Sequence, residues 1–156
     1  MIAYVDGDAA GWARIGPRPG QQRIVHTRAI VRATGEPLDD DGVWSLTCFV
    51  VRTQYRGRGL NSVLLAAAVD LAERSGARMI EAYPVDTSRG EHRPNDLYHA
   101  TLSTFVSAGF TVGLALTGGR VLVSAARPDL NPRDDRLSTG SHYLPCQGHA
   151  ARAGRE

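Results

Sequence analysis

The chain has 156 residues, enough for one domain with a sizeable core. Charged residues make up 22% of it and apolar residues 42%, close to globular averages, which excludes collagen, other fibres and wholesale disorder. The net charge is +2 and the basic residues are scattered along the chain, so the composition does not predict nucleic-acid binding.

Cysteines and apolar runs indicate the compartment. Two cysteines, Cys48 and Cys146, are too few and too differently placed for a disulfide framework, and we expect Cys48 to be a small core residue. No signal-peptide pattern follows Met1, and no apolar run approaches the roughly 20 residues that span a bilayer. We therefore expect a cytoplasmic protein with no membrane partner, and we predict no metal site because no ligand cluster has a defined spacing.

The chain begins with a predicted β-hairpin. Residues 2–5 and 9–15 flank Asp6-Gly7-Asp8, a strong turn signal. After a Gly- and Pro-rich loop, residues 23–32 fit a short strand or a short helix, and the pattern does not decide between them. Residues 35–42 contain three consecutive aspartates and are predicted to form a solvated turn.

The middle of the chain reads as strand, glycine loop and helix. Residues 43–51 are rich in β-branched and aromatic residues, typical of a buried strand. Residues 54–62 contain the sequence Arg56-Gly57-Arg58-Gly59. From Leu60 onward, apolar residues recur at helical spacing, which predicts a helix with one buried face that stops at Ser75-Gly76.

A helix that begins at a glycine loop favours an anionic ligand. The first turn leaves backbone N–H groups without partners and carries the positive end of the helix dipole. Gly57 and Gly59 allow a ligand to approach the backbone closely, and Arg56 and Arg58 add positive charge. The loop is therefore a predicted phosphate-binding site.

Several interpretations of this loop remain open. A mononucleotide P-loop fits poorly, because no lysine followed by Ser or Thr comes after the last glycine. The dinucleotide pattern G-x-G-x-x-G is only partly present, since Ser62 stands at the third glycine, although Glu81 lies where a ribose-binding acid is expected. A loop that serves packing and solubility alone is the simplest alternative.

The second half of the domain continues with strand, helix and hairpin. Residues 78–85 are a predicted strand, parallel to residues 43–51. A helix is expected from Pro94-Asn95-Asp96 to Gly109. Residues 110–117 and 120–127 form a predicted hairpin around Gly118-Gly119. We expect residues 1–128 to be one domain and residues 129–156 to be a tail without a fold of its own.

A third interpretation of the loop comes from a family resemblance. The residues Tyr55-Arg56-Gly57-Arg58-Gly59-Leu60 resemble the R-x-x-G-x-G/A signature of the GNAT superfamily of N-acetyltransferases, with Asn61 at its final small position. The order of the elements over residues 2–127 looks like the GNAT fold from its second strand onward. The resemblance implies an α/β (α+β) fold with a mixed sheet, N-terminally truncated, since the family's opening strand and helices do not precede Met1; a true start upstream of Met1 is the alternative.

The resemblance also implies a co-substrate, acetyl-CoA. In that family the strand before the loop splays from its parallel neighbour and its backbone binds the pantetheine arm and the thioester. Carried over, this role falls to the backbone of Phe49, Val50 and Val51. The pyrophosphate would be bound by the amides of Arg56, Gly57, Arg58, Gly59, Leu60, Asn61 and Ser62.

The same resemblance suggests the catalytic groups. Glu81 is the carboxylate expected beside the cofactor strand and would act as a base through water, with Asp86 as the alternative. An equally open interpretation makes Glu81 the partner of a nearby arginine such as Arg56 or Arg78. Which carboxylate serves as base therefore stays open.

The family often places a general-acid tyrosine four residues before a Gly-Phe pair. Phe105 occupies that position here and cannot donate a proton. Tyr98, seven residues earlier and on about the same face of the expected helix, would take the role, or solvent would. A core position for Tyr98 is the alternative.

The function implied is transfer of an acetyl group to a primary amine of an unknown small molecule or protein. The partners expected are acetyl-CoA and the amine acceptor, and a homodimer is left open. The main alternative is a non-catalytic acyl-CoA binding module or degenerate copy, favoured by Phe105 and the missing opening. A truncated copy is expected to expose an edge strand and an apolar sheet face.

Overall fold

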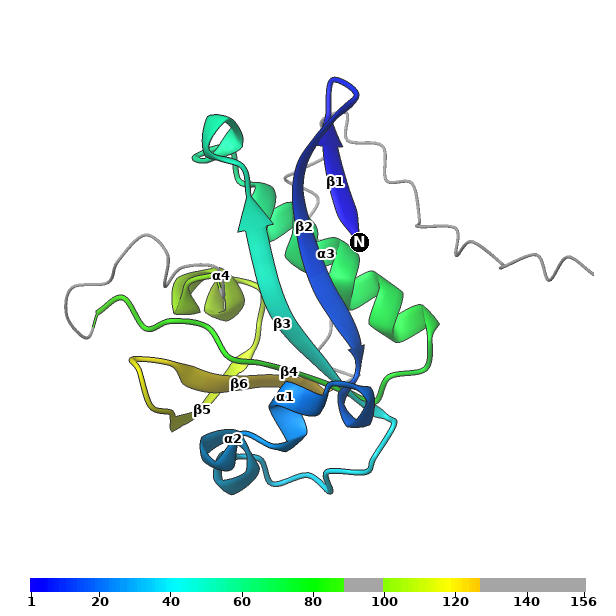
Figure 1. Cartoon of the computed structure of the whole chain (residues 1–156), viewed down its shortest axis with the longest axis vertical. Coiled ribbons are helices and arrows are strands. Elements are labelled where there is room, and N and C mark those ends of the chain that lie inside the picture. Colours follow the sequence, from blue (N-terminus) through cyan, green and yellow to red (C-terminus); the bar gives the residue numbers. More distant parts are fainter. Residues whose placement is uncertain (89–99, 127–156) are drawn as a thin grey trace, which may run out of the picture.

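The computed structural model describes residues 1–88 and 100–126, in which six strands form one mixed sheet. Their order is β1-β2-β3-β4-β6-β5 (Figure 1). The strands are β1 Ile2–Val5, β2 Asp8–Pro17, β3 Val43–Val51, β4 Met79–Ala82, β5 Thr111–Ala115 and β6 Val121–Ala126. The two predicted hairpins are present, and the predicted pairing of β3 with β4 is parallel.

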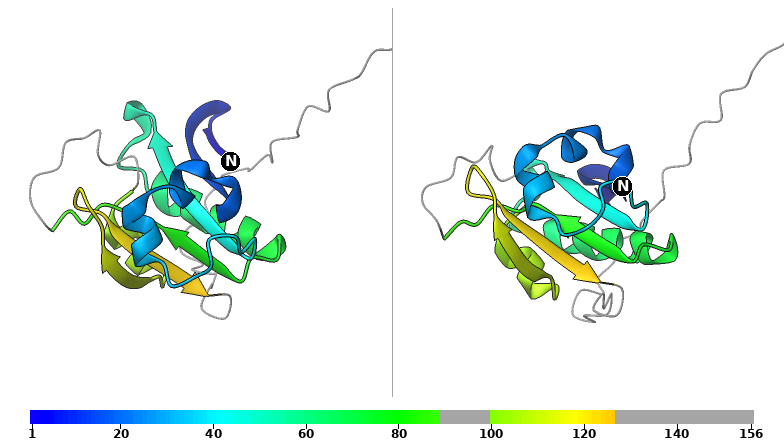
Figure 2. Two further views of the ribbon diagram at one scale, coloured as in Figure 1. Left: turned by 60° about the horizontal axis from the view of Figure 1, so that its bottom comes forward. Right: turned by 90° about the horizontal axis from the view of Figure 1, so that it is seen from below.

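Helices cover both faces of the sheet. They are η1 Arg18–Gly20, α1 Gln22–Val25, α2 Arg28–Ala33, η2 Thr53–Tyr55, α3 Leu60–Arg74 and α4 Leu102–Ser107. Figures 1 and 2 show α1 and α2 on one face and α3 on the other. In the part of the chain that the structure describes, no helix is both long and apolar enough to cross a membrane.

Helix α3 has the predicted bounds, and its apolar stripe anchors the domain. Leu64, Leu65 and Ala68 are fully buried against the sheet, and each fully buried leucine contributes about 1.5–3 kcal/mol. The helix ends as predicted: Gly76 has a φ of +82°, and the Ala77 amide bonds the Ala72 carbonyl at 2.9 Å. This packing fixes where α3 begins, and therefore where the glycine loop lies.

Strands β3 and β4 stay together for only part of their length. The last registered pair is Leu46 with Ala82, where β4 ends, whereas β3 continues to Val51. Beyond Ala82, the Val85 amide bonds the Ala100 carbonyl at 3.1 Å and the Leu102 amide bonds the Val85 carbonyl at 2.8 Å, so Val85 pairs with Thr101 and not with β3. The predicted strand is shorter than residues 78–85 for this reason. The two strands therefore form a fork, visible in Figure 1 as the divergence of β3 from β4.

A β-bulge lies at the base of this fork. Arg14 of β2 pairs with Cys48, and the next residue, Ile15, pairs with Leu46, so Thr47 is the extra residue of β3. The side chain of Gln21 fixes the bulge: its Nε2 donates to the Ser45 carbonyl at 2.6 Å, and Thr47 Oγ1 donates to its Oε1 at 3.1 Å. Bulges bend a strand and end its regular pairing, which is what occurs here.

The undecided segment, residues 23–32, is helical. Helices α1 and α2 cover one end of the sheet, where Ile30 packs with Tyr83, Leu116 and Leu122. The expected uncovered face is found only in part. Among the described strands, β1 has a neighbour on one side only, and a hollow of about 350 Å³ is lined by Met1, Ile2, Ala9, Gly11, Trp12, Val50 and Arg52.

The last helix differs from its prediction. It was expected to start at Pro94-Asn95-Asp96, but α4 begins at Leu102, because Thr101 is extended and Ala100 has a φ of +59°. Both follow from the parallel bridge of Thr101 to Val85. The argument that put Tyr98 on the face of this helix is therefore wrong. Tyr98 itself, like the predicted tail of residues 129–156, lies outside the described residues.

Gly11 provides a test of the β2–β3 pairing. A Cβ at Gly11 would meet the Val50 carbonyl oxygen at 2.7 Å, so Gly11→Ala must displace the cofactor strand of the resemblance. We expect a loss of about 1–3 kcal/mol in the free energy of unfolding, measured by chemical denaturation. The control is Gly16→Ala in the same strand, where nothing lies within 4 Å of the added Cβ and stability should not fall. Equal losses in both variants would contradict this account.

Candidate active site

The loop before α3 presents a row of backbone amides. Gly57 and Gly59 have φ angles of +74° and +73°, which glycine adopts without strain, and no side chain caps the helix. The Arg56 amide bonds the Thr53 carbonyl, and the Ser62 amide bonds that of Gly59. Among the described residues, no partner accepts from the five amides from Gly57 to Asn61. The start of α3 can therefore bind an anion.

Tyr55 holds this loop, a role that the sequence analysis missed. Its ring is buried beside Ala10 and Leu60, and its hydroxyl donates to Asp8 Oδ2 at 3.1 Å. The Arg58 guanidinium lies 5.5 Å from the ring centroid, a cation–π distance. The position of Tyr55 directly before the glycine loop was the available signal. Tyr55 thus links Arg58, part of the predicted positive charge of the loop, to Asp8 of the N-terminal hairpin.

The C-terminal end of β3 pairs with a described strand on one side only. Phe49, Val50 and Val51 pair with β2 on one side, and on the other side β4 has already ended. The Phe49 side chain is buried in the core, where it meets Phe105 of α4 edge to face with ring centroids 5.8 Å apart. The structure thus brings the predicted strand and the predicted loop into one continuous path from β3 to α3.

A cavity of about 560 Å³ opens at the fork, on the face that carries α1 and α2. Thr47 and Cys48 of the bulge line one wall and Val85 lines another. Cys48 is half-buried in this wall, which corrects its assignment to the core. The lining is Arg14, Gly20, Gln21, Gln22, Arg23, Ile24, Thr27, Ile30, Thr47, Cys48, Val85, Gly118 and Arg120.

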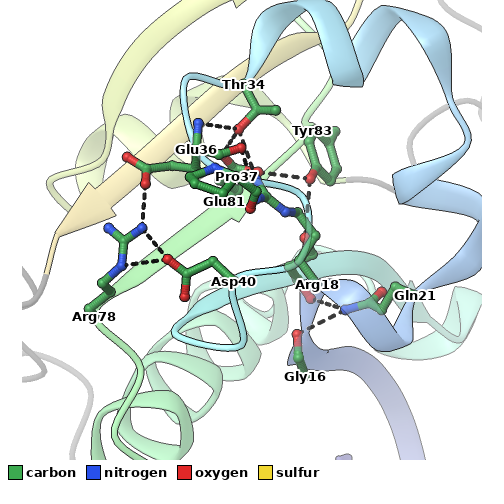
Figure 3. A network of polar contacts seen from close by, with 11 residues as sticks. Gly16, Arg18, Gln21, Thr34, Glu36, Pro37, Asp40, Arg78, Glu81 and Tyr83 are labelled. Atoms are coloured by element: carbon green, nitrogen blue, oxygen red, sulfur yellow. Dashed lines mark hydrogen bonds and ion pairs between the residues drawn. The ribbon is translucent and has the colours of Figure 1, made fainter.

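Glu81 lies in a buried polar network rather than in the cavity wall (Figure 3). Its side chain is 2% exposed, and Arg18 Nη1 donates to its Oε2 at 2.9 Å. Thr34 Oγ1 donates to the other oxygen at 2.6 Å, and the Tyr83 hydroxyl donates to Oε2 at 3.2 Å. Both carboxylate oxygens are therefore engaged.

Arg18 is the centre of this network and was not singled out from the sequence. It is fully buried, and its Nη2 donates to the carbonyls of Glu36 and Pro37 (Figure 3). Its position between Pro17 and Pro19, in a stretch predicted as loop, gave no periodic signal. The guanidinium ties the loop that precedes β3 to Glu81 on β4, and so holds the closed end of the fork.

This geometry favours the interpretation of Glu81 as an ion-pair partner. The arginine is Arg18 and not Arg56 or Arg78; Arg78 instead pairs with Glu36 and Asp40 (Figure 3). The hydrogen bond from Arg78 lowers the pKa of the Asp40 carboxyl below its ordinary value.

Phe105, at the position of the family's general-acid tyrosine, cannot supply a general acid. That side chain is fully buried, within 5.2 Å of the Phe110 ring, so it belongs to the core. Burial, followed by the charge of Glu81, raises the pKa of the Tyr83 hydroxyl well above its ordinary value. Tyr83 therefore stays neutral and acts as a hydrogen-bond donor within the network. No group of metal-ligating side chains occurs in residues 1–88 or 100–126.

Comparison with known proteins agrees with this geometry. The model of the acetyltransferase (GNAT) family matches residues 1–99. A search of curated proteins finds no significant match. Among solved structures, the chain is similar to BjaI, a CoA-dependent acyl-homoserine lactone synthase solved with SAM and isopentyl-CoA. The TM-score is 0.58 and the identity 22%, over 83% of this chain and 59% of BjaI.

Two further structures are similar in fold. The aminoglycoside acetyltransferase AAC(6')-Ib, solved with coenzyme A, gives a TM-score of 0.55 at 20% identity, over 82% of this chain and 65% of that one. A GCN5-related N-acetyltransferase from Kribbella flavida gives 0.51 at 23% identity, over 78% and 62%. The chain thus spans 59% to 65% of the length of these three proteins.

The Arg18–Glu81 pair can be tested by a double-mutant cycle. Arg18→Met and Glu81→Gln should each lower the free energy of unfolding by about 3–5 kcal/mol, because each leaves a buried group without its partner. The double variant should lose less than the sum of the two. Denaturant unfolding measures all four proteins, and strictly additive losses would show that the two side chains do not act as a pair.

Proposed function

Since the chain belongs to the GNAT acetyltransferase family, whose model matches residues 1–99, we propose that it is an acetyl-CoA-dependent N-acetyltransferase. Its acceptor is a primary amine of a small molecule or protein. The observation that carries this proposal is the fork between β3 and β4, which joins a cavity of about 560 Å³ to a row of loop amides that have no partner among the described residues.

The proposed co-substrate lies along β3. Its pyrophosphate binds the amides from Arg56 to Ser62, where the start of α3 favours negative charge. Its pantetheine arm follows the backbone of Phe49, Val50 and Val51 along the edge that β4 leaves open. The thioester then reaches the bulge at Thr47, beside the cavity. Holding the co-substrate along β3, beside the cavity that takes the amine, supplies the orientation that acyl transfer needs.

The proposed reaction takes place at the thioester carbonyl carbon. The neutral amine attacks that carbon, so a C–N bond forms and the C–S bond breaks. The amine loses a proton, and the coenzyme A thiolate leaves and takes up a proton. Backbone N–H groups of β3 near Phe49 polarise the carbonyl as charge develops on its oxygen.

The general base and the general acid are also part of the proposal. Asp86 is the alternative candidate for base, because it follows Val85 of the cavity wall; its Oδ1 accepts from the amide and the hydroxyl of Ser88, at 3.1 and 2.6 Å. We assign Glu81 a positioning role. For the acid, Tyr98 stays a prediction from the sequence, with solvent as the alternative.

A non-catalytic acyl-CoA binding module is the second candidate. It is favoured by Phe105, which replaces the tyrosine of the family pattern in the core, and by the engaged carboxylate of Glu81. Both candidates share the same loop and the same fork. They differ only in whether an amine is acetylated.

Two further properties are part of the proposal. We place the protein in the cytoplasm, which agrees with the free thiol of Cys48. We leave a homodimer as a proposal supported by the open edge of β1 and the apolar hollow around Trp12. Light scattering of the purified chain measures whether it forms a homodimer.

The assay for function is thiol release from acetyl-CoA over a panel of primary amines. We expect acetyl-CoA, and not NAD, to raise the melting temperature, because a ligand bound only by the native state stabilises it. We expect thiol release that requires the amine. Stabilisation without turnover would favour the binding module, and stabilisation by NAD alone would defeat both candidates.

Gly59→Ala tests the phosphate loop. The added methyl group would stand where the pyrophosphate approaches the start of α3. We therefore expect the apparent affinity for acetyl-CoA, measured from its effect on the melting temperature, to fall by at least about tenfold. The matched control is Gly76→Ala. Gly76 has a similar φ of +82° with nothing within 4 Å of its Cβ position, but it lies at the other end of α3. Equal effects on binding in both variants would place the coenzyme elsewhere.

A further inference from the structure

The cavity at the fork is lined by basic side chains from three directions. Arg14 comes from β2, Arg23 from α1 and Arg120 from the turn before β6. Among the described residues that line it, none is an aspartate or a glutamate. Such a cavity carries a local charge that the small net charge of +2 conceals.

These arginines contrast with the structural ones. Every ion pair in residues 1–88 and 100–126 involves Arg18, Arg74 or Arg78. The one described hydrogen bond from the Arg120 side chain is to the carbonyl of Thr117, at 3.5 Å. Arg14, Arg23 and Arg120 have no acidic partner in the described part, so an anion that binds in the cavity meets no competing carboxylate there.

The coenzyme is not the anion that these side chains best fit. Its pyrophosphate is assigned to the amides that follow Tyr55, beyond the end of β3. Cys48, the partner of Arg14 in the β2–β3 register, lies three residues before Val51. At about 3.3 Å per strand residue, this puts Arg14 about 10 Å short of the strand end, on the thioester side. The arginines therefore face the acceptor.

We propose, on the basis of the proposed function, that the acceptor is a small amine that also carries a carboxylate or phosphate group. Arg14, Arg23 and Arg120 bind the anionic group, and the amine is directed toward the bulge at Thr47. Planar guanidinium groups bind both kinds of anion through paired hydrogen bonds. A polycationic acceptor would be repelled, so the substrate in the name of the aminoglycoside acetyltransferase is not carried over.

Matched acceptors test the inference. β-Alanine is compared with β-alaninamide, and phosphoethanolamine with ethanolamine, in the thiol-release assay. Each pair differs in the anionic group, and the two pairs separate carboxylate from phosphate. We expect kcat/KM to be at least about tenfold higher for the anionic member of one pair. Equal or higher values for both neutral members would overturn the inference and leave the proposed function standing.

Variants locate the effect. We expect a KM about tenfold higher for the acceptor with the anionic group in each of three variants, Arg14→Gln, Arg23→Gln and Arg120→Gln. The KM for the matched acceptor without that group should change little. Arg32→Gln is the control, because Arg32 is exposed on α2 and does not line the cavity. The ratio between the two acceptors removes the intrinsic reactivity of each amine. An unchanged ratio in all three cavity variants would overturn the assignment.

A binding measurement separates this inference from the proposed function. With coenzyme A present to occupy the phosphate loop, β-alanine or phosphoethanolamine should raise the melting temperature of the native chain but not of the three cavity variants. That result supports the anion site even if no amine is acetylated. If neither compound raises the melting temperature of the native chain, the inference fails, whatever the turnover results show.

Discussion

The parting of β3 from β4 is the constraint on which the rest of this molecule depends. A parallel pair normally continues until one strand ends, and here β4 ends at Ala82 because the amide and carbonyl of Val85 bond Ala100 and Leu102 instead of β3. The bulge at Thr47 bends β3 at the same level. One backbone edge of a buried strand is thereby left for a ligand, next to a cavity, without any loss of core packing on the α3 side.

The closed end of the fork must be held rigidly, and the buried Arg18–Glu81 ion pair holds it. Arg18 and Glu81 are both almost fully removed from water, which is costly unless their polar atoms are hydrogen-bonded; in the described part of the chain all of them except Arg18 Nε have a partner. Carbonyls of the loop before β3 accept from the guanidinium, and Thr34 and Tyr83 donate to the carboxylate. The network joins the chain on both sides of the fork at its closed end. A carboxylate so placed is better suited to hold β4 than to move protons.

How much the sequence predicts depends on how local the signal is. The bounds of β3 and α3, and both hairpins, follow from periodicity and turn residues, and the glycine loop from its spacing. The helical segment after β2 is too short for a period, and the start of α4 depends on a bridge between Val85 and Thr101, distant in sequence. Arg18 has no local pattern at all, because its partner lies 63 residues away. The sequence left open that Glu81 pairs with an arginine, but it could not identify Arg18 as that arginine.

The distribution of charge explains why a nearly neutral chain can still bind anions. The acidic residues at positions 36 and 40 are engaged by Arg78, and Glu81 is engaged by Arg18. The arginines left without acidic partners in the described part include Arg58 at the loop and Arg14 and Arg120 at the cavity. Positive charge thus remains at both ends of the path along β3. Because a field in a partly enclosed site is screened less than on an open surface, this placement matters more than the net charge.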